Sequence, residues 1–345
     1  MIGRMLILGR EDIARSITMA EAISAVENAF EAHAGGHTLT PLRISMTTPD
    51  QAGHLLYMPS LIDPEGRPAG LSIKVYAEFA RNPEKGLPLA HAYCLLIDST
   101  DGRLLALLEG MYVTGIRTGA ASAVAAKYLA RKDSETVGLI GTGFQAFFQA
   151  WGLSQVRPIK QLVVYDRSSA SMQAFAEKAE KDLHLRVHCA GSADEVAASS
   201  DILVTATNAC RPVFDGTKLR VGTMVVAIGS FHPNEREIDT ATVVRSTIYV
   251  DSYEGALAEA GDLLIPMEQG EISRDSIKGE LGELVTGRVA GRQSDDEVIF
   301  FKAVGVAAED TAVAESIYAQ AVEKRLGIPV SLIAVSYTHL RAHET

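Results

Sequence analysis

A glycine-rich turn gives this chain its clearest candidate for a site that does chemistry. The turn consists of Gly141, Thr142, Gly143, Phe144, Gln145 and Ala146. It follows the apolar run Val137–Ile140 and leads into an apolar segment typical of a helix. Gly141 permits a tight turn, Gly143 lets the backbone approach a pyrophosphate, and Ala146 allows close packing of the helix on a strand. Because the N-terminus of that helix offers free N–H groups and a positive dipole, the pattern predicts a dinucleotide-binding turn.

An acidic residue ends the next apolar run and would complete such a site. Asp166 follows Leu162–Tyr165 and stands 20 residues after Ala146. A carboxylate at this place accepts hydrogen bonds from the ribose hydroxyls of NAD and repels the 2′-phosphate of NADP. Arg167 and Ser168 follow directly and could hold that phosphate if Asp166 turned away. We therefore expect NAD as the preferred cofactor, with NADP possible.

Two later apolar runs end in residues that we expect at the same cofactor. The runs Asp201–Thr207 and Met224–Gly229 are typical of buried strands. In a doubly wound sheet, ligands lie at the carboxyl ends of the strands, and we expect the loop after the second run near the nicotinamide. The cofactor contacts predicted in this way are Thr205, Ala206, Thr207, Gly229 and Ser230, together with Lys302 in the later run that starts at Phe300.

Three basic residues stand in unusual surroundings and could bind an anion. Arg43 lies inside the predicted strand LRISM, Lys74 inside the apolar strand LSIKVY, and Arg117 among the small residues of TGIRTGAAS. A lone lysine in a strand usually faces water, so Lys74 alone proves little. Arginine is almost never buried unpaired, so Arg117 should face an anionic ligand or a carboxylate partner. Together the three make a candidate set for binding a substrate carboxylate.

The first third of the chain must position these basic residues, and it reads as a helix followed by a largely antiparallel sheet. Ser16–Ala34 has apolar residues at helical spacing. The expected strands, separated by turn residues, are Met1–Leu8, Leu42–Thr47, His54–Met58, Gly70–Tyr76, Ala90–Asp98 and Leu104–Glu109. The small-residue segment Met111–Arg131 predicts a helix that can approach a sheet very closely.

The rest of the chain alternates strands with helices around the glycine-rich turn. Besides the runs named above, this part contains Ser168–Lys181 and Ser192–Ala198 as expected helices and Arg186–Cys189 and Thr247–Asp251 as expected strands. Such alternation predicts a parallel, doubly wound α/β sheet. After Phe300–Asp310, a last helix over Thr311–Arg325 has an apolar face that could return to the first domain. The polar segment Ser336–Thr345 has no core periodicity and is interpreted as a disordered or foreign tail.

Composition excludes several classes of function. The net charge of −11 argues against nucleic acid or an anionic membrane surface as the main partner. The chain has no 18-residue apolar run for a transmembrane helix and no apolar N-terminal core for a signal peptide. Cys94, Cys189 and Cys210 lack metal-ligand spacing, so we expect no metal and interpret them as reduced core thiols of a cytoplasmic protein.

Several motifs, taken in order, carry a resemblance to a known family. They are PLRISM, HLLYMPS, GLSIKVY, TGIRTGAAS, GLIGTGFQA, DILVTAT, GSFHPNEREID, VDSYEGALAEAGDLL, GELGELVTGR and FKAVGVAAED. Over about Met5 to Gly327 the chain resembles the ornithine cyclodeaminase/mu-crystallin family. Together these motifs are far more specific than the glycine-rich turn alone.

The resemblance implies a fold, an assembly and a range of activities. It implies a homodimer, in which a doubly wound Rossmann domain (116–305) is inserted into a split α+β domain (1–115 and 306–335) for substrate binding and dimerisation, ahead of the tail at 336–345. Family members include cyclodeaminases of ornithine or lysine, alanine dehydrogenases, hormone-binding mu-crystallins, and reductases of cyclic imino acids.

The resemblance also implies roles for particular residues. Arg43, Lys74 and Arg117 match the residues that hold the substrate carboxylate, and Lys74 is also the expected proton donor or relay. The aspartate that cyclodeaminases use on the substrate amine is replaced here by Phe231, or by Ser230 if the alignment shifts by one residue. A second cyclodeaminase acid is also absent, since Leu56 belongs to the run Leu55-Leu56-Tyr57-Met58-Pro59.

These departures favour NAD(P)H-dependent reduction of a preformed cyclic imine, Δ1-pyrroline-2-carboxylate or Δ1-piperideine-2-carboxylate, to L-proline or L-pipecolate. Three alternatives stay open at this point: an ornithine cyclodeaminase, an alanine dehydrogenase, and a ligand-binding protein without turnover.

Overall fold

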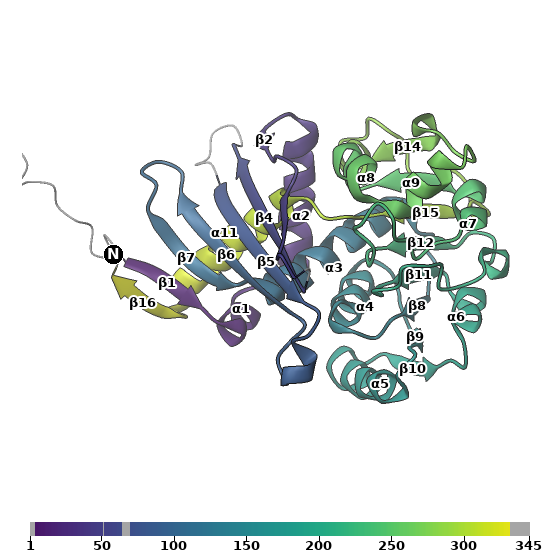
Figure 1. The fold of residues 1–345 in the computed structure, drawn as a ribbon, viewed down its shortest axis with the longest axis horizontal. Helices are drawn as coiled ribbons and strands as arrows, with labels where there is room; N and C mark the ends of the chain where they lie inside the picture. The colour runs from purple at the N-terminus through teal and green to yellow at the C-terminus, as the bar shows by residue number, and fades with distance from the viewer. Residues whose placement is uncertain (1–3, 51, 64–69, 332–345) are drawn as a thin grey trace, which may run out of the picture.

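The chain folds around two separate β-sheets. The structure, a computed structural model, describes residues 4–50, 52–63 and 70–331. Each sheet has eight strands, and helix α3 (Gly110–Leu129) connects the first sheet to the second (Figure 1). The predicted tail at 336–345 lies outside the described residues. In this part of the chain, no helix is long and apolar enough to cross a membrane.

The first sheet is antiparallel apart from one parallel pair among its described strands. Its order is β16-β1-β7-β6-β5-β4-β2, and β3 also pairs with β4. Strands β1 and β7 run parallel. The strands are β1 (Arg4–Leu8), β2 (Thr38–Leu39), β3 (Ile44–Thr47), β4 (Gly53–Ile62), β5 (Gly70–Phe79), β6 (Ala90–Asp98), β7 (Leu104–Glu109) and β16 (Ile328–Ser331). The largely antiparallel sheet predicted from the sequence is therefore confirmed, with β16 as an unpredicted edge strand.

One face of this sheet is covered by α11 (Ala307–Lys324), which comes from the far end of the chain. Figure 1 shows α11 running across the sheet beside α2 (Met19–Ala34). The Ser72 hydroxyl on β5 lies 2.8 Å from the Thr311 hydroxyl on α11. Since successive side chains of a strand point to opposite faces, Lys74, Tyr76 and Glu78 share this face with Ser72. Helix α11 begins near Lys74, so the end of β5 beyond it is left open toward the second sheet.

The second sheet is parallel throughout its described strands. Its order is β10-β9-β8-β11-β12-β15-β13-β14. The strands are β8 (Thr136–Ile140), β9 (Gln161–Tyr165), β10 (Arg186–Cys189), β11 (Ile202–Thr205), β12 (Met224–Ala227), β13 (Thr247–Val250), β14 (Ile277–Glu280) and β15 (Ile299–Lys302). The doubly wound α/β sheet predicted from the alternating pattern is confirmed.

Helices lie on both faces of the parallel sheet. Figure 1 shows α4 and α5 on one face and α6 and α7 on the other. The helices of this half are α4 (Phe144–Val156), α5 (Ser169–Leu183), α6 (Ala193–Ser199), α7 (Thr240–Arg245), α8 (Tyr253–Glu259), α9 (Gly261–Glu268) and α10 (Leu281–Val285). Short 3₁₀ turns occur at Pro83–Lys85, Gly216–Lys218 and Arg274–Ser276.

The small residues of α3 allow close contact with the first sheet and with α4. The sequence predicted close helix–sheet packing, and a Cβ on Gly110 would lie 2.6 Å from the carbonyl carbon of Ala92 on β6; the closest approach, however, is between α3 and α4. A Cβ on Gly119 would lie 2.3 Å from the carbonyl oxygen of Phe148, and one on Gly152 would lie 2.3 Å from that of Gly119. Only residues without a side chain allow the two backbones this near. The domain boundary predicted between residues 115 and 116 falls inside α3, which is continuous there. The boundary therefore stays a prediction.

Three sequence predictions need correction. The helix predicted over Ser16–Ala34 starts later, as α2 at Met19, because Thr18 caps it and the Thr18 backbone N–H binds Glu21 at 2.7 Å; Ser16 ends a separate helix, α1 (Arg10–Ser16). The last helix starts at Ala307 and not at Thr311, since the Val306 N–H binds the Glu309 carboxylate at 2.8 Å and caps the helix earlier. Cys94 is buried, but Cys189 and Cys210 are exposed and are not core thiols.

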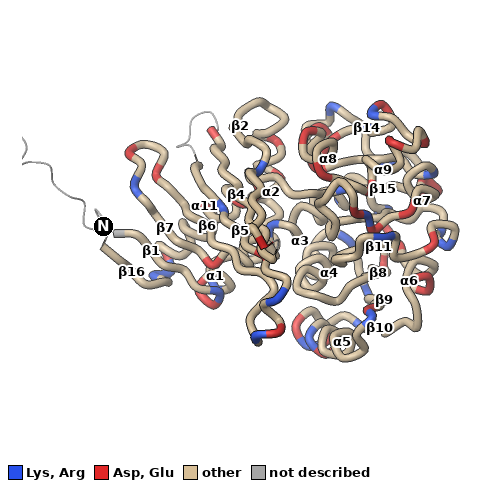
Figure 2. Tube along the Cα trace, in the orientation of Figure 1, with Lys and Arg blue, Asp and Glu red and all other residues tan. Residues whose placement is uncertain are grey.

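Charged residues of both signs occur in both halves of the molecule. Figure 2 shows short basic and acidic segments scattered over both halves, and no continuous basic stripe appears in this view. This distribution agrees with the acidic net charge of −11.

Candidate active site

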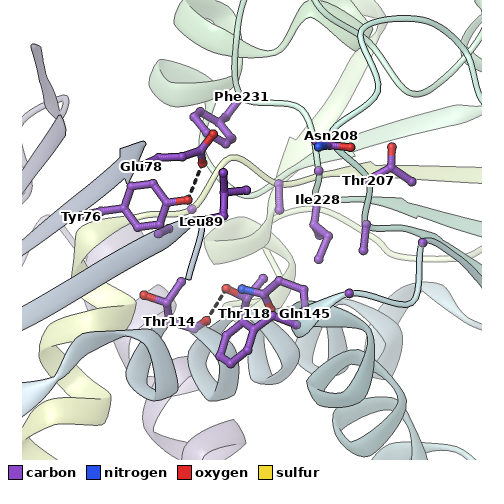
Figure 3. A pocket seen from close by; sticks show the side chains of 18 of the residues that line it. Tyr76, Glu78, Leu89, Thr114, Thr118, Gln145, Thr207, Asn208, Ile228 and Phe231 are labelled. Atoms are coloured by element: carbon purple, nitrogen blue, oxygen red, sulfur yellow. Dashed lines mark hydrogen bonds between the residues drawn. The ribbon is translucent and has the colours of Figure 1, made fainter. Parts of the chain in front are cut away.

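A large cleft is lined by residues of both halves of the chain. Its volume is about 1190 Å³, which exceeds the roughly 300–1,000 Å³ of most small-molecule sites. Strands β4 and β5 and helix α3 contribute from one side, and the loops after β8, β9, β11 and β12 contribute from the other (Figure 3). The cleft therefore has room for a dinucleotide beside a small substrate, at the strand ends where ligands bind in such sheets.

The glycine-rich turn has the backbone geometry that a phosphate-binding turn needs. Gly141 has a φ of +93°, and a Cβ there would lie 2.6 Å from the carbonyl oxygen of Ala206. Gly143 lines the cleft, and no protein atom lies within 4 Å of where its Cβ would be. A side chain at Gly143 would project into space that a ligand needs. Helix α4 starts directly after this glycine, so its N-terminus points to the same space and fits an anionic phosphate.

Asp166 is held at the end of β9 by the same turn. Its carboxylate accepts hydrogen bonds from the Thr142 N–H at 2.8 Å, the Thr142 hydroxyl at 3.0 Å and the Ser168 N–H at 2.9 Å. Burial opposes ionisation, but these hydrogen bonds outweigh it and keep the pKa of Asp166 below its usual value. Asp166 and Arg167 both line the cleft. The acid is therefore ionised and fixed at the place where a ribose would lie.

The predicted cofactor residues divide into those that face the cleft and those that support it. The cleft wall includes Gly141, Gly143, Phe144, Gln145, Asp166, Arg167, Ala206, Thr207 and Gly229. The structure does not bring the others to that wall: they are Thr142, Ala146, Ser168, Thr205, Ser230 and Lys302. Ala146, Thr205 and Lys302 are fully buried. Strand alternation turns Lys302 inward, where its ammonium group meets a buried carboxylate.

Lys74 and Arg117 lie together in the cleft wall and are paired with two acids from α11. The Lys74 Nζ atom lies 2.8 Å from Asp310 Oδ1 and 2.7 Å from Asp310 Oδ2. The Arg117 Nη1 atom lies 2.9 Å from Glu309 Oε2, and its Nε atom lies 3.3 Å from Asp310 Oδ1. All four side chains are at most 8% exposed. The sequence left open whether Arg117 meets a ligand or a carboxylate, and the structure provides the carboxylates.

Burial changes the proton affinity of these groups. Burial lowers the pKa of Lys74 to about 8, because the free-energy cost of removing the ammonium group from water exceeds the stabilisation by the neighbouring Asp310 charge. Burial also raises the pKa of the Glu309 carboxyl, against the opposing charge of Arg117. A group with a pKa near the ambient pH can both give and accept a proton, so Lys74 is the member of the set best suited to proton transfer.

Arg43 lines the same cleft, and it lies directly before β3 rather than inside the strand predicted over Leu42–Thr47. Its Nε atom lies 2.9 Å from Glu259 Oε1, its Nη2 atom also binds that carboxylate, and its guanidinium carbon lies 5.5 Å from the ring centre of Phe231. Both Arg43 and Phe231 line the cleft, whereas Ser230 is buried and donates its hydroxyl to the carbonyl oxygen of Glu235 at 2.7 Å. The structure thus brings all three predicted basic residues to one cleft, and Phe231 with them.

Several residues of the cleft were missed from the sequence. Tyr76 donates a hydrogen bond of 2.6 Å to Glu78, and both point into the cleft beside Phe231 (Figure 3). Glu309 and Asp310, the partners of Arg117 and Lys74, were also missed. One signal could have found Tyr76 and Glu78, because alternate residues of β5 share the face of Lys74. The acids of α11 gave no local signal, since they stand 192 and 236 residues away from their partners in sequence.

Comparison with known proteins agrees with this architecture. The chain is 37% identical to a Delta(1)-pyrroline-2-carboxylate reductase of Bacillus cereus over 324 residues, which is 94% of this chain and 98% of the relative. The solved structure of the Thermococcus litoralis Delta(1)-pyrroline-2-carboxylate reductase in complex with NADH and L-proline is 42% identical. It superposes with a TM-score of 0.91 over 94% of this chain and 100% of that chain.

A second solved structure is an archaeal alanine dehydrogenase dimer with bound NAD. It is 32% identical and superposes with a TM-score of 0.88 over 96% of this chain and 100% of that one. The sequence profile of the ornithine cyclodeaminase/mu-crystallin family matches residues 4–325. The chain belongs to the ornithine cyclodeaminase/mu-crystallin family.

Proposed function

We propose that this protein reduces a cyclic imino acid, Δ1-pyrroline-2-carboxylate or Δ1-piperideine-2-carboxylate, to L-proline or L-pipecolate with NADH. The observation that carries the proposal is the cleft itself, in which a dinucleotide-binding turn faces Lys74, Arg117 and Arg43. The relatives described above support the choice of reaction, because two of them, at 37% and 42% identity, are named for the reduction of pyrroline-2-carboxylate.

The cofactor would be held by the turn and by the acid that follows it. Gly141 and Gly143 leave room for the pyrophosphate, the N-terminus of α4 faces it, and Asp166 accepts from the ribose. When bound, a reduced nicotinamide supplies the hydride that the imine carbon receives. NADP as an alternative cofactor is part of this proposal, because Arg167 lines the cleft next to Asp166.

The substrate carboxylate would bind the three basic side chains. Arg117 donates a hydrogen bond from Nη1 to Glu309, its Nε atom lies 3.3 Å from Asp310 without a hydrogen bond, and Nη2 makes no hydrogen bond among the described residues. That leaves one side of the planar guanidinium for a ligand, and guanidinium groups bind carboxylates well. Lys74 and Arg43 stand in the same cleft wall. Holding the acid group in this way orients the C=N bond, which supplies much of the rate acceleration.

Lys74 would supply the proton that the reaction consumes. Reduction adds a hydride to carbon and a proton to nitrogen, so the imine becomes a secondary amine. The Lys74 ammonium can donate that proton because its pKa is lowered to about 8. Asp310, 2.8 Å away, keeps the side chain in place while its charge changes. Burial excludes bulk water from this pair, which is 2% and 0% exposed.

The wall around the ring position is mainly apolar. Leu56 and Met58 are buried and pack with Ala307, and Phe231 and Tyr76 pack against them. Such a wall suits a hydrocarbon ring better than the ammonium group of ornithine. One observation favours the cyclodeaminase alternative: Glu78 brings a carboxylate into the cleft that could bind an amine. Glu78 also accepts a hydrogen bond from the Tyr76 hydroxyl at 2.6 Å, and the apolar wall around this acid is the reason that we favour the imine reductase.

The test is a panel of substrates with the purified protein. Δ1-pyrroline-2-carboxylate, Δ1-piperideine-2-carboxylate, pyruvate with ammonia, and ornithine are each offered with NADH and with NADPH. We expect stoichiometric oxidation of NADH with a cyclic imine and little ammonia from ornithine. Release of ammonia from ornithine at a catalytic amount of NAD would identify a cyclodeaminase. Turnover of pyruvate with ammonia, and of no other compound in the panel, would identify an alanine dehydrogenase. Binding without turnover of any compound would identify a ligand-binding protein.

We also propose that the protein is a homodimer, with a localisation in the cytoplasm. All four residues of β3 are exposed, and Leu39, Ile44 and Met46 have 69%, 59% and 53% of their surface accessible. An apolar strand surface of this kind normally meets a partner. Light scattering should give twice the chain mass, and Ile44→Glu with Met46→Glu should give a monomer. A monomeric unmodified protein would reject this part of the proposal.

A further inference from the structure

We propose that Glu237 is a positioning residue, whose buried carboxylate fixes the two loops that form the cofactor side of the cleft. This inference rests on the proposed function, because it assigns the loops to a dinucleotide. Glu237 is fully buried, does not line the cleft, and is not among the residues that the sequence indicated. What it contacts places it directly behind the cleft wall.

The carboxylate of Glu237 joins the ends of two neighbouring strands. Its Oε1 atom accepts from the Thr207 N–H and the Thr207 hydroxyl, both at 2.7 Å. Its Oε2 atom accepts from the Thr205 hydroxyl at 3.0 Å and the Gly229 N–H at 2.7 Å. Thr205 is the last residue of β11, Thr207 lies in the loop after it, and Gly229 lies in the loop after β12. One side chain thus spans both loops and binds two donors on each of its oxygens.

A second acid and a lysine hold Glu237 itself. Asp262 Oδ1 accepts from the backbone N–H groups of Glu237 and Ile238 at 2.7 and 2.9 Å. Asp262 Oδ2 lies 2.8 Å from Lys302 Nζ, which also donates to the carbonyl oxygen of Ser230 at 2.6 Å. Asp262 and Lys302 are fully buried. The lysine that the sequence suggested for the cofactor therefore ties β15 to the loop after β12.

This arrangement matters because the two loops present bare backbone to the cleft. Ala206, Thr207 and Gly229 line it, and none of them belongs to a strand or helix. Gly229 packs tightly, since a Cβ there would lie 2.2 Å from the carbonyl oxygen of Thr207 and 2.6 Å from the carboxyl carbon of Glu237. Backbone hydrogen bonds hold Ala206 and Ile228 at the strand ends, and beyond these residues the Glu237 carboxylate holds Thr207 and Gly229 together. A displacement of about 1 Å at such a wall is enough to impair a bound ligand.

An amide cannot replace the Glu237 carboxylate without losing a hydrogen bond to one of the two loops. Each of its oxygens faces a backbone N–H, and a backbone N–H cannot act as an acceptor. In Glu237→Gln, the amide NH₂ would meet the N–H of either Thr207 or Gly229, so one loop would be pushed away. Burial raises the pKa of Glu237, but the four donors around it fit the ionised form. The substitution therefore tests the spacing of the loops with almost no change in side-chain volume.

The experiment measures NADH binding directly, by the fluorescence of the reduced nicotinamide, together with melting temperature. Glu237→Gln should raise the Kd for NADH by about 10- to 100-fold, the range known for the loss of a supporting partner at metal sites. The KM for the imine at saturating NADH should change much less. Thr205→Val removes one buried donor to Glu237 and should give a smaller increase in Kd. Thr205→Val also tests the positioning role if Glu237→Gln does not fold.

A matched control, Asp201, lies directly before β11, at the opposite end of the strand that Thr205 ends. The Asp201 carboxylate accepts from the backbone N–H groups of Glu135 and Thr136 at 2.9 and 3.0 Å and is 11% exposed. It lies away from the cleft. Asp201→Asn should lower the melting temperature while leaving the NADH Kd within about twofold, the scatter expected for independent sites. Comparison of Glu237→Gln with Asp201→Asn separates an effect on the position of the loops from an effect on the stability of the fold.

The outcomes distinguish this inference from the proposed function. Unchanged NADH affinity in both Glu237→Gln and Thr205→Val would overturn the positioning role, as would an equal loss in Asp201→Asn. If the unmodified protein binds NADH but reduces no imine, the proposed reaction fails while the titration still decides the role of Glu237. If the unmodified protein binds no dinucleotide, both proposals fail.

Discussion

Two groups of buried charges lie on opposite sides of the cleft, and they differ in what faces the open space. The open network consists of Lys74, Arg117, Glu309 and Asp310, and the closed network consists of Glu237, Asp262 and Lys302. In the open network, Lys74 and Arg117 form part of the cleft wall. No member of the closed network does so, and backbone from residues 205–207 and 229–230 lies between it and the cleft.

The difference shows how burial can serve either chemistry or geometry. In the open network, the cations pair mainly with side chains, and Arg117 keeps a nitrogen for a ligand. In the closed network, backbone N–H and C=O groups complete the hydrogen bonding. A charged side chain in the cleft wall that is paired with other side chains can change its partner when a ligand binds. A charged side chain that is hydrogen-bonded to backbone groups instead fixes the position of those loops. Substitutions should therefore impair turnover in the first network and cofactor binding in the second.

The largest effect is expected at Lys74. Lys74→Met keeps the length of the side chain and removes the ammonium group, so no proton donor remains beside the imine nitrogen. We expect kcat for imine reduction to fall by about 10²- to 10⁴-fold, the usual contribution of a general acid. The Kd for NADH should stay unchanged, because Lys74 belongs to the substrate side. A kcat within about tenfold of the unmodified protein would remove Lys74 from the proton-transfer step.

The pH dependence sharpens the same point. The pKa of Lys74 is lowered to about 8, so the ammonium form needed for reduction is lost above that pH. We expect kcat/KM for reduction to fall as pH rises through about 8, and kcat/KM for the oxidation of L-proline to rise over the same range. Lys74→Met should lack this transition. A profile that is flat between pH 7 and 9 would contradict the assignment.

Stability should change in the opposite sense to reduction. The pKa of Lys74 is about 8 in the folded protein and 10.5 at its ordinary value. Between these two values the unfolded chain binds more protons, so the contribution of Lys74 to stability rises with pH. Denaturant titrations at pH 8 and 10 should show this gain relative to Lys74→Met. An equal pH dependence in both proteins would show that Lys74 titrates normally.

A smaller but still large effect is expected at Arg117. Arg117→Ala should lower kcat/KM for the imine by about 100-fold or more, because a buried charge pair loses one partner at a cost of roughly 3–5 kcal/mol. The contacts with Glu309 and Asp310 mean that the melting temperature should fall too. Arg117→Lys keeps the charge but not the planar fork, and it should recover stability more than kcat/KM. Near-normal kinetics in Arg117→Ala would leave Arg117 a purely structural role.

The parts of this site that the sequence could predict are those encoded within a short stretch. The spacing of Gly141, Gly143 and Asp166 lies within one strand-turn-helix-strand unit, and the structure places all three at the cleft. Arg117 could be singled out because arginine among small residues needs a partner. Which partner it has depends on Glu309, which lies 192 residues further along the chain. A pairing over that distance is set by the fold, because α11 returns to the first sheet.

Lys302 shows a second limit of prediction from sequence. A lysine in an apolar run at a strand end suggests a ligand contact, and the position at the carboxyl end of β15 is indeed next to the cleft. Alternation along a strand gives the face on which a side chain lies, but not what lies beneath that face. Here the space beneath holds Asp262, which draws the ammonium group inward. Glu237 and Asp262 stand in the motifs GSFHPNEREID and VDSYEGALAEAGDLL, but nothing in their spacing shows what they bind, because each acts through groups on other strands.

The smallest effect concerns the choice of cofactor, and it tests the outer end of the cleft. The ionised Asp166 lies where a 2′-phosphate would sit, and at an effective dielectric of about 20 the repulsion would amount to a few kcal/mol near contact. Asp166 is partly accessible to solvent, so screening reduces this. We expect NADH to be preferred, and Asp166→Asn to shift the ratio of kcat/KM values toward NADPH by about tenfold.

Two features of the structure make this test specific. Asp166 also accepts hydrogen bonds from Thr142 and Ser168, so Asp166→Ala would loosen the glycine-rich turn and weaken both cofactors together. Asp166→Asn keeps an acceptor for one of these N–H groups while removing the charge. Arg167 lines the same part of the cleft, and Arg167→Ala should lower only the activity with NADPH. If the unmodified protein required NADPH, the repulsion at Asp166 would be too weak to select the cofactor. Arg167 would then be the residue that decides it, because its guanidinium would bind the phosphate while the charge of Asp166 is partly stabilised by three N–H and O–H donors.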